Sequence, residues 1–170
     1  SNLNSINLSQ NTSLISLRIW DSGISNLDLS QNVLLDSLQL SGYWNFTTLD
    51  LSQNTALTYL NCTYNELTSL DLRNGNNINF SYCNIESWGG YQSDNNENLY
   101  CVDVDDPAWF FNFYWGNWCW PCNSIFFSLN CPIYGCTDSS AYNYNPNATV
   151  DDTTCSYPVP KTYVPDNDFE

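Results

Sequence analysis

The chain has 170 residues, of which 42% are hydrophobic and 16% aromatic, so it holds enough apolar side chains for a folded core. Its 18 acidic residues outnumber 3 basic ones and give a net charge of -15, which excludes nucleic acid and anionic membrane surfaces as partners, because both bind clustered lysine and arginine. No apolar run is long enough to span a bilayer, so the sequence predicts no direct membrane insertion.

Residues 1–106 contain a repeat of 21 to 22 residues with two apolar blocks in each period. The form is L-x-x-L-x-L-x-x-N/C-x-L, and we assign Asn65 and Cys83 to its N/C position. A single unit cannot bury its apolar face alone, so the pattern predicts a leucine-rich repeat solenoid of parallel β-strands with an irregular or 3-10 convex side. The first blocks are Leu3, Ile6, Leu8; Ile24, Leu27, Leu29; Phe46, Leu49, Leu51; and Leu67, Leu70, Leu72, and the second are Leu14, Leu17, Ile19; Leu35, Leu38, Leu40; and Leu57, Leu60, Cys62.

The repeat lengthens over residues 88–96 and resumes at Leu99-x-x-Val102-x-Val104, which we expect to be the last coil. Residues 107–133 then break the pattern with a cluster of aromatic side chains. The end of a solenoid exposes an apolar cross-section that needs a cover, so this cluster predicts an aromatic C-terminal cap. A platform for stacking sugar rings is the alternative, and both roles are compatible. The cluster comprises Trp109, Phe110, Phe111, Phe113, Tyr114, Trp115, Trp118, Trp120, Phe126 and Phe127.

Eight cysteines in so short a chain favour an oxidising location, because zinc sites usually recruit histidine and the chain has none. Cys119 and Cys122 have the spacing of a zinc or redox motif. One such pair is only half a zinc site, however, and the βαβ context of a redox motif is absent, so we interpret it as a structural disulfide. Cys62 and Cys83 fall at inward positions of different coils, which predicts buried free thiols.

Residues 134–158 form a predicted small module with Cys136 and Cys155 at its ends. A disulfide between these cysteines would close a loop of about 20 residues and contribute about 3 kcal/mol in the chain-entropy model. The loop also carries oxygen ligands of the type that calcium binds in sets of six to eight, although their spacing is not that of an EF-hand. Because Asn and Asp also form turns, the alternative is a purely structural role. The candidate ligands are Asp138, Asn143, Asn145, Asp151 and Asp152.

The variable positions of the strands supply a candidate ligand-binding surface, because solenoids usually bind partners on their concave face. This set is polar, nearly uncharged and includes two aromatic residues, which suits a glycan or a protein better than an ionic ligand. A merely solvated face is the alternative. The candidates are Arg18, Trp20, Gln39, Tyr59, Asn61 and Asn79, with Ser16, Ser37, Ser41, Thr63, Asn77 and Ser81 beside them.

Six N-x-S/T triplets are candidate glycosylation sites in a eukaryotic secretory pathway. A chain rich in Asn, Ser and Thr also contains such triplets by chance. They begin at Asn7, Asn11, Asn45, Asn61, Asn79 and Asn147.

Three segments resemble known families. The repeats at 49–67, followed by 98–106, resemble leucine-rich repeat proteins secreted by Bacteroidetes-type bacteria. This resemblance implies a disulfide between Cys101 and Cys131, and O-glycosylation at Ser37 and Thr153. Residues 135–155 are similar to a Cys-bounded module of large surface proteins, with Thr153-Thr154 in place of its usual Gly-Ser. Residues 161–170 resemble the opening of the N-terminal cap of the same repeat family, which predicts that residues 159–170 are a linker and the start of a following repeat domain.

The sequence offers little material for catalysis. Asp105-Asp106 and Asp151-Asp152 are paired acids of the kind that glycosidases use, but adjacent acids in turns are usually solvated or bind calcium. Without histidine, a phosphate loop or a nucleophile motif, we predict that the chain is not an enzyme.

The first residues fall inside a repeat, so the first coil is expected to present bare Leu and Ile side chains and an unpaired strand edge. Contacts that do not close into a ring make filaments. We therefore predict a secreted, cell-surface structural segment that assembles head to tail with copies of itself or with adjacent domains of one long chain. The alternative is an adhesion module that binds a glycan or a host or cell-surface protein through the concave face.

Overall fold

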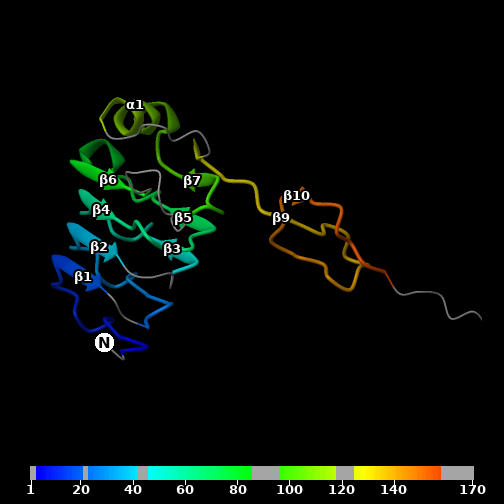
Figure 1. Cartoon of the computed structure of the whole chain (residues 1–170), viewed down its shortest axis with the longest axis horizontal. Coiled ribbons are helices and arrows are strands. Elements are labelled where there is room, and N and C mark those ends of the chain that lie inside the picture. The colour runs from blue at the N-terminus through cyan, green and yellow to red at the C-terminus, as the bar shows by residue number, and fades with distance from the viewer. Residues whose placement is uncertain (1–2, 21–22, 42–45, 86–95, 118–124, 158–170) are drawn as a thin grey trace, which may run out of the picture. The chain divides into compact units, whose positions relative to one another are not determined.

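The structure is a computed structural model that describes residues 3–20, 23–41, 46–85, 96–117 and 125–157. It divides into two compact units, Ser1–Cys131 and Pro132–Glu170 (Figure 1). Among the described residues, no helix has the length and apolar character needed to cross a membrane. The lengthened stretch at 88–95, the Cys119–Cys122 pair and residues 159–170 lie outside the described residues, so their predictions stay open.

The first unit is a solenoid with two parallel four-stranded sheets, as the leucine spacing predicts. Sheet A contains β1 (Ser16–Trp20), β2 (Ser37–Ser41), β4 (Tyr59–Asn61) and β6 (Tyr82–Asn84), in that order. Sheet B contains β3 (Thr48–Asp50), β5 (Ser69–Asp71), β7 (Cys101–Asp103) and β8 (Phe126–Ser128). From β2 to β7 the chain alternates between the sheets, so each of these coils adds one strand to sheet A and one to sheet B (Figure 1).

The two apolar blocks of each repeat explain the two sheets. The second block supplies sheet A, where Leu38 is in register with Leu17 and Leu60. The first block supplies sheet B, where Leu49 is in register with Leu70. The side predicted to be irregular or 3-10 has no strand in the first blocks of the first two coils and carries sheet B from β3 onward. In the described part of the chain, the single 3-10 turn is η1 (Asn77–Asn79).

The core is a column of inward leucines between the two sheets. Leu38, Leu60 and Leu70 are fully buried, and so are the leucines that flank them at both ends of each block. Burial of a leucine side chain contributes about 1.5–3 kcal/mol, and it is possible here only because neighbouring coils stack.

An asparagine ladder, which we define as Asn11, Asn32, Asn54 and Asn74, links the coils at the turn after each first block. Asn32 Nδ2 donates to the backbone oxygens of Leu8 and Asn11, at 3.1 and 2.8 Å. Asn54 Nδ2 donates in the same way to Leu29 and Asn32, at 3.0 and 2.9 Å. Asn74 Nδ2 continues the ladder to the Asn54 oxygen at 3.1 Å. Asn32, Asn54 and Asn74 thus each bond to the turn of the preceding coil.

A second pair of asparagines, Asn65 and Asn96, forms similar hydrogen bonds between coils after the strands of sheet A. Asn65 Nδ2 donates to the Leu40 oxygen of the preceding coil at 2.9 Å, as its N/C position predicts. Asn96 Nδ2 donates to the oxygens of Cys62 and Ile85 at 3.0 and 2.7 Å. Both side chains are buried, so their amides replace water as partners of backbone groups.

The fourth coil corrects part of the sequence alignment. Cys83 lies in β6 in register with Leu60, so it fills a leucine position and not the N/C position assigned to it. The block is Phe80-x-x-Cys83-x-Ile85, which contains no leucine and was missed for that reason. The predicted outward positions Asn77, Asn79 and Ser81 therefore precede the strand, and η1 takes up the extra length of this repeat.

Helix α1 (Pro107–Asn117) covers the last coil. Asp106 Oδ1 caps it by accepting hydrogen bonds from the N–H groups of Ala108 and Trp109, each at 3.0 Å. Phe110 is fully buried and packs against Phe127, with ring centroids 4.8 Å apart. These contacts agree with the predicted aromatic cap.

The cap is also tied to sheet B by a strand and a disulfide. Strand β8 pairs with β7, so the segment after α1 continues the sheet. Cys101 forms a disulfide with Cys131, the pairing that the family resemblance implies. The side chains of Tyr114 and Trp115, and residues Trp118 and Trp120, lie outside the described set.

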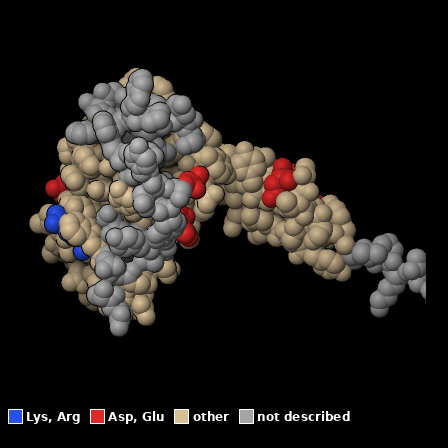
Figure 2. Space-filling model, in the orientation of Figure 1, with Lys and Arg blue, Asp and Glu red and all other residues tan. Residues whose placement is uncertain are grey.

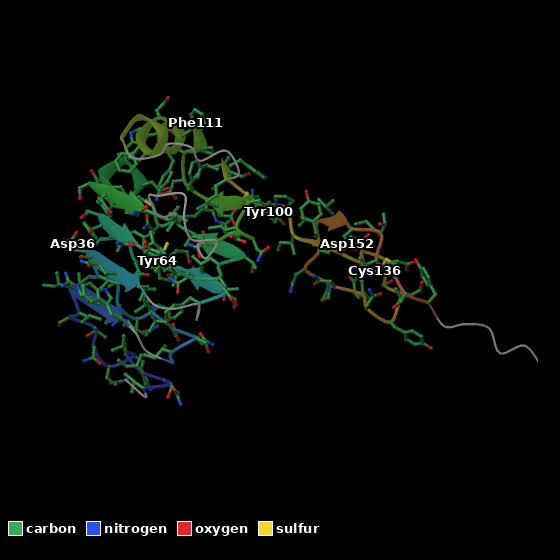
Figure 3. The ribbon with its side chains drawn as sticks, viewed as in Figure 1. Asp36, Tyr64, Tyr100, Phe111, Cys136 and Asp152 are labelled. Carbon is green, nitrogen blue, oxygen red and sulfur yellow. A yellow bond between two sulfur atoms is a disulfide. The ribbon has the colours of Figure 1, made fainter. Side chains whose placement is uncertain are left out.

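The second unit is a small module with very little core. Its strands β9 (Tyr134–Gly135) and β10 (Val150–Asp151) are parallel. Cys136 is buried and forms the predicted disulfide with Cys155 (Figure 3). Because so few apolar side chains are buried here, the disulfide is the main constraint on the loop.

We expect Asn54→Ala to lower the free energy of unfolding by about 1–3 kcal/mol, because two buried hydrogen bonds are lost. The two acceptor carbonyls each keep a backbone partner, which limits the cost. Urea denaturation followed by circular dichroism measures the change. Gln53→Ala, at an exposed neighbour, is the matched control and should change stability by less than about 0.5 kcal/mol. Equal effects of the two substitutions would contradict the ladder's role.

Cys62 and Cys83 are free, fully buried thiols, as predicted. Burial raises the pKa of the Cys62 thiol to about 12 and also raises the pKa of Cys83. Both groups are therefore protonated at about pH 8, and the thiolate is the reactive form. We expect neither to react with a thiol reagent at this pH in the folded protein, whereas both should react after denaturation. Peptide mapping by mass spectrometry would identify any modification in the native state.

Candidate functional site

The outward side chains of sheet A form the candidate binding surface, which we call the sheet A face. Two rows of residues cross it, because the four strands are parallel and in register. The first row is Ser16, Ser37, Tyr59 and Tyr82; the second is Arg18, Gln39, Asn61 and Asn84; and Trp20 lies beyond them at the end of β1.

Two tyrosines from neighbouring strands stack on this face. The ring centroids of Tyr59 and Tyr82 are 4.5 Å apart and their planes differ by 11°. Asn84 Nδ2 donates to the Tyr82 hydroxyl at 3.2 Å, which fixes the second ring. Burial raises the pKa of Tyr59, the adjacent Tyr82 adds to that rise, and the positive charge of Arg18 opposes it. The pair is therefore a rigid aromatic element, and the Tyr59 hydroxyl is protonated at neutral pH.

Arg18 is the cation of the sheet A face. Its guanidinium carbon lies 5.1 Å from the centroid of the Trp20 ring, a cation–π contact between neighbouring outward positions of one strand. Within the part of the chain that the structure describes, both ion pairs belong to Arg73 and none to Arg18. Arg18 thus presents a positive charge that no carboxylate neutralises in these described ranges.

Sheet B has the opposite character. Strands β3, β5 and β7 end in aspartates that are in register, Asp50, Asp71 and Asp103, and Arg73 lies beside this column. Its guanidinium pairs with Asp71, lies 3.9 Å from Asp103, and donates to the Leu129 oxygen at 3.1 Å. In the view of Figure 2, most acidic atoms of the solenoid gather over the β3 and β5 side, and basic atoms lie over the β1 and β2 side with one acidic group beside them. Arg73 is therefore a structural clamp between β5 and the segment after β8.

The structure brings together five of the six residues predicted for ligand binding: Arg18, Trp20, Gln39, Tyr59 and Asn61. Asn79 is the exception, because it lies in η1 and donates through Nδ2 to Asn76 Oδ1 at 2.6 Å. The sequence prediction also missed Tyr82 and Asn84. Their signal was present, because Tyr82-Cys83-Asn84 repeats the outward pair of Tyr59-Leu60-Asn61 with a cysteine at the inward position.

The candidate calcium ligands already accept hydrogen bonds within the second unit. Asp138 Oδ1 accepts from the Ser140 N–H at 2.8 Å, and Asn145 Oδ1 accepts from the Asn147 N–H at 3.0 Å. Asp152 Oδ1 accepts from the Thr154 N–H at 2.9 Å. These are turn-forming bonds, the alternative that the sequence left open.

The two remaining candidates bond in similar ways. Asn143 Oδ1 accepts from the Ser156 N–H at 2.8 Å, and Asp151 Oδ1 accepts from the Thr153 N–H at 2.7 Å. Thr153 has a positive φ of 65°, at the place where the similar module has glycine. In the residues that the structure covers, no group of three or more acidic, Cys or His side chains could hold a metal ion, and the calcium site stays a prediction.

The candidate glycosylation residues have mixed surroundings. Asn7, Asn11, Asn79 and Asn147 are exposed, whereas Asn61 and Ser37 are half-buried in sheet A. Thr153 is exposed in its turn, and Asn45 lies outside the described residues. Modification of any of them stays a prediction.

No family model and no curated protein matches the chain. Among solved structures, it is similar to the functional domain of InlJ from Listeria monocytogenes, which is described as including a cysteine ladder. The two are 28% identical, the match covers 61% of this chain and 23% of that chain, and the TM-score is 0.43. This chain thus spans less than a quarter of that protein's length. Its own buried thiols form no column, because Cys83 is in register with Leu60 and not with Cys62.

We expect the pKa of Asp138 to lie below its ordinary value, because the N–H and hydroxyl of Ser140 and the Tyr157 hydroxyl donate to its carboxylate. The Tyr157 bond is 2.8 Å long. A lowered carboxylate pKa stabilises the fold above the ordinary pKa of about 3.9, and this contribution is lost as the pH falls through the folded-state pKa. The same bond raises the pKa of Tyr157, whose contribution is lost as the pH rises through that raised value.

Tyr157→Phe should therefore move the pKa of Asp138 upward, as measured by carbon-13 NMR of its carboxyl group. Tyr142→Phe is the control, because Tyr142 is 77% exposed and has no such bond to Asp138. An unchanged Asp138 pKa in the Tyr157 variant would show that the hydrogen bond does not form in solution.

Proposed function

We propose that this chain is a structural segment of an extracellular surface protein that packs end to end with copies of itself, as in a fibre or filament. The observation that carries the proposal is the difference, within the described residues, between the exposed apolar side chains of the first coil and the covered last coil. Location outside the cell is supported by the two disulfides, Cys101–Cys131 and Cys136–Cys155, because such bonds persist in oxidising environments.

The first coil presents an apolar surface at one end of the solenoid. Leu3 is 48% exposed and Ile6 is 36% exposed, although the equivalent residues of the third and fourth coils, Phe46, Leu49, Leu67 and Leu70, are buried. Leu17 is also only partly buried, whereas its register partner Leu38 is fully buried. Strand β1 is at the edge of sheet A, so one side of it lacks a paired strand in the described chain. An apolar face with an open strand edge favours association.

The asparagine ladder also ends at this surface. Asn32 and Asn54 each donate to the turn of the preceding coil, and Asn11 occupies the equivalent position of the first coil. Asn11 is exposed, and beside it lies an open hollow of about 370 Å³ lined by Gln10, Thr12, Ser13 and Leu14. A packed neighbour could therefore accept the next hydrogen bond of the ladder.

The opposite end of the solenoid is covered, which makes the association directional. Phe110 and its aromatic neighbours fill the space between α1 and the last coil. A contact between two different surfaces is heterologous, and when it does not close into a ring it produces a filament. Because these two surfaces of the solenoid differ, they support head-to-tail packing.

A second copy offers a suitable partner surface in its small module. Four tyrosines of that unit are exposed, and tyrosine is enriched in protein interfaces. They are Tyr134, Tyr142, Tyr144 and Tyr157. We propose that these rings of one copy cover the exposed leucine and isoleucine side chains of the next.

We also propose that the chain is not an enzyme. The acid pairs that could support glycoside hydrolysis have structural partners. Asp106 caps α1, and Asp105 accepts a hydrogen bond from the Asn77 N–H at 3.5 Å. Asp151 and Asp152 accept the turn bonds of the small module.

Adhesion through the sheet A face is a second candidate function. The observation in its favour is the combination of Arg18 with the stacked pair Tyr59 and Tyr82 on one outward surface. Such a mixture of aromatic and polar groups suits recognition better than mere solvation does.

Sedimentation velocity over a concentration series, with electron microscopy of the largest species, tests the assembly. We expect elongated, concentration-dependent species for the native sequence, and association weakened about tenfold or more by Leu3→Ser or Tyr142→Ser. Ile78→Ser is the matched control, because Ile78 is 65% exposed but lies in η1. A monomer at every concentration, or equal effects of all three variants, would contradict the proposal.

A further inference from the structure

We propose that the sheet A face binds a carboxylate-bearing glycan, with Arg18 paired to the carboxylate and the outer ring face of Tyr59 stacked on a sugar ring. This inference rests on the second candidate function, adhesion through sheet A. It names the chemical class of the ligand, and it holds whether or not copies of the chain assemble end to end.

The ring of Tyr59 has one occupied face and one that points toward smaller neighbours. Its separation from the Tyr82 ring is close to the spacing of neighbouring strands, about 4.8 Å, so the two rings stand side by side across the sheet. The opposite face of Tyr59 is therefore turned toward β2. The residue of β2 in register with Tyr59 is Ser37, and Ser16 follows it in β1.

Because serine side chains are short, this row leaves a shallow space beside the Tyr59 ring and above Ser37 and Ser16, which we call the step. An aromatic face above a polar floor matches a sugar ring, which has apolar C–H groups on its face and hydroxyls at its edge. Tyr82 packs on the other face of the Tyr59 ring, and Asn84 holds Tyr82 in place through its hydrogen bond to the Tyr82 hydroxyl.

Arg18 supplies the charge for a carboxylate. The four strands of sheet A contain no acidic residue, although the chain as a whole has a net charge of -15. Asp36 precedes β2, and its Oδ1 accepts a hydrogen bond from the Thr58 hydroxyl at 2.5 Å. Trp20 restrains the guanidinium through the cation–π contact, which lowers the entropy cost of pairing with a ligand.

The row that contains Arg18 continues with three amides: Gln39, Asn61 and Asn84. Amide groups carry both donors and acceptors and can match the hydroxyls of a sugar. Asn61 Oδ1 is held by the Thr63 hydroxyl at 2.9 Å, which orients its Nδ2 group. Tyrosine and arginine are also enriched in protein interfaces, so the choice of a glycan rests on this row of amides, whose paired donors and acceptors match the adjacent hydroxyls of a sugar. The observations therefore favour a glycan over an acidic peptide.

Isothermal titration calorimetry of the full chain with an oligogalacturonate, and with its methyl ester, tests the proposal. The ester keeps the rings and hydroxyls but removes the charge. We expect the acid to bind about tenfold or more tightly than the ester, and we expect added salt to reduce this difference. Arg18→Gln should abolish the preference for the acid.

Two substitutions test the stacking. Tyr59→Ala should remove binding of both ligands, and Ser37→Leu should do the same by filling the step while leaving the ring pair intact. Tyr59→Phe keeps the ring and should retain binding. Tyr142→Ala, in the other unit, is the tyrosine control, and circular dichroism checks that each variant is folded.

The possible failures are distinguishable. Equal binding of acid and ester would overturn the carboxylate inference but leave adhesion standing. Binding of poly-glutamate in place of the oligogalacturonate would overturn the glycan class in favour of an acidic peptide. Absence of binding to all three probes would overturn both the inference and adhesion through this face. A sedimentation measurement of assembly is unaffected by any of these results.

Discussion

The solenoid depends on asparagine side-chain amides that donate hydrogen bonds to the backbone carbonyl groups of its buried turns. Parallel strands pair within each sheet, but the chain must also turn between the sheets while its carbonyl groups stay close to the core. In the first turn, the oxygens of Leu8 and Asn11 each accept one backbone N–H from their own coil. Asn32 of the next coil supplies the second bond. Coils are therefore stable as neighbours and not as isolated units, which is the physical basis of a quasi-one-dimensional fold.

The two outward surfaces of the solenoid carry different chemistry although they come from the same repeat. The first block places an aspartate directly after its middle leucine, where its side chain accepts a hydrogen bond from the N–H two residues on, and in β3 and β5 this aspartate is the last residue of the strand. Asp28, Asp50 and Asp71 all do so, at 2.9, 2.9 and 3.0 Å. Arg73 joins this column, so its charge is compensated there, whereas Arg18 faces outward from sheet A. Position within the repeat thus decides which of the two arginines is available to a ligand.

The sequence predicts the solenoid, its core and most of the sheet A face, because leucines at fixed spacing leave few ways to bury them. It fails at the fourth coil for a specific reason. Phe80 and Cys83 fill the core positions of leucines, so a search for leucine assigns Asn79 to a strand that begins at Tyr82. The apolar spacing of the first block does not tell an irregular segment from a strand, and the structure contains both: no strand at 24–29, but β3 and β5 in the next two coils.

The small module shows a different limit of sequence reasoning. Composition identifies Asp and Asn as oxygen donors, but it cannot say which atom each oxygen meets. In the structure most of these oxygens accept a backbone N–H two residues on, as at Asp138 and Asp152, and Asn143 accepts from Ser156. The disulfides were easier to predict, because Cys136 and Cys155 bound one compact segment and the Cys101–Cys131 pairing followed from a family resemblance.

The one-way donation of the asparagine ladder bears on how such chains change length during evolution. Every donor reaches back by one coil, so a duplicated or deleted coil recreates the same bonds at its new boundary. A shift of a single residue within a turn would instead break the bonds on both sides of it. Gene duplication in whole periods is therefore the tolerated route to longer or shorter relatives, and small insertions should collect in the loops that lie away from Asn32, Asn54 and Asn74.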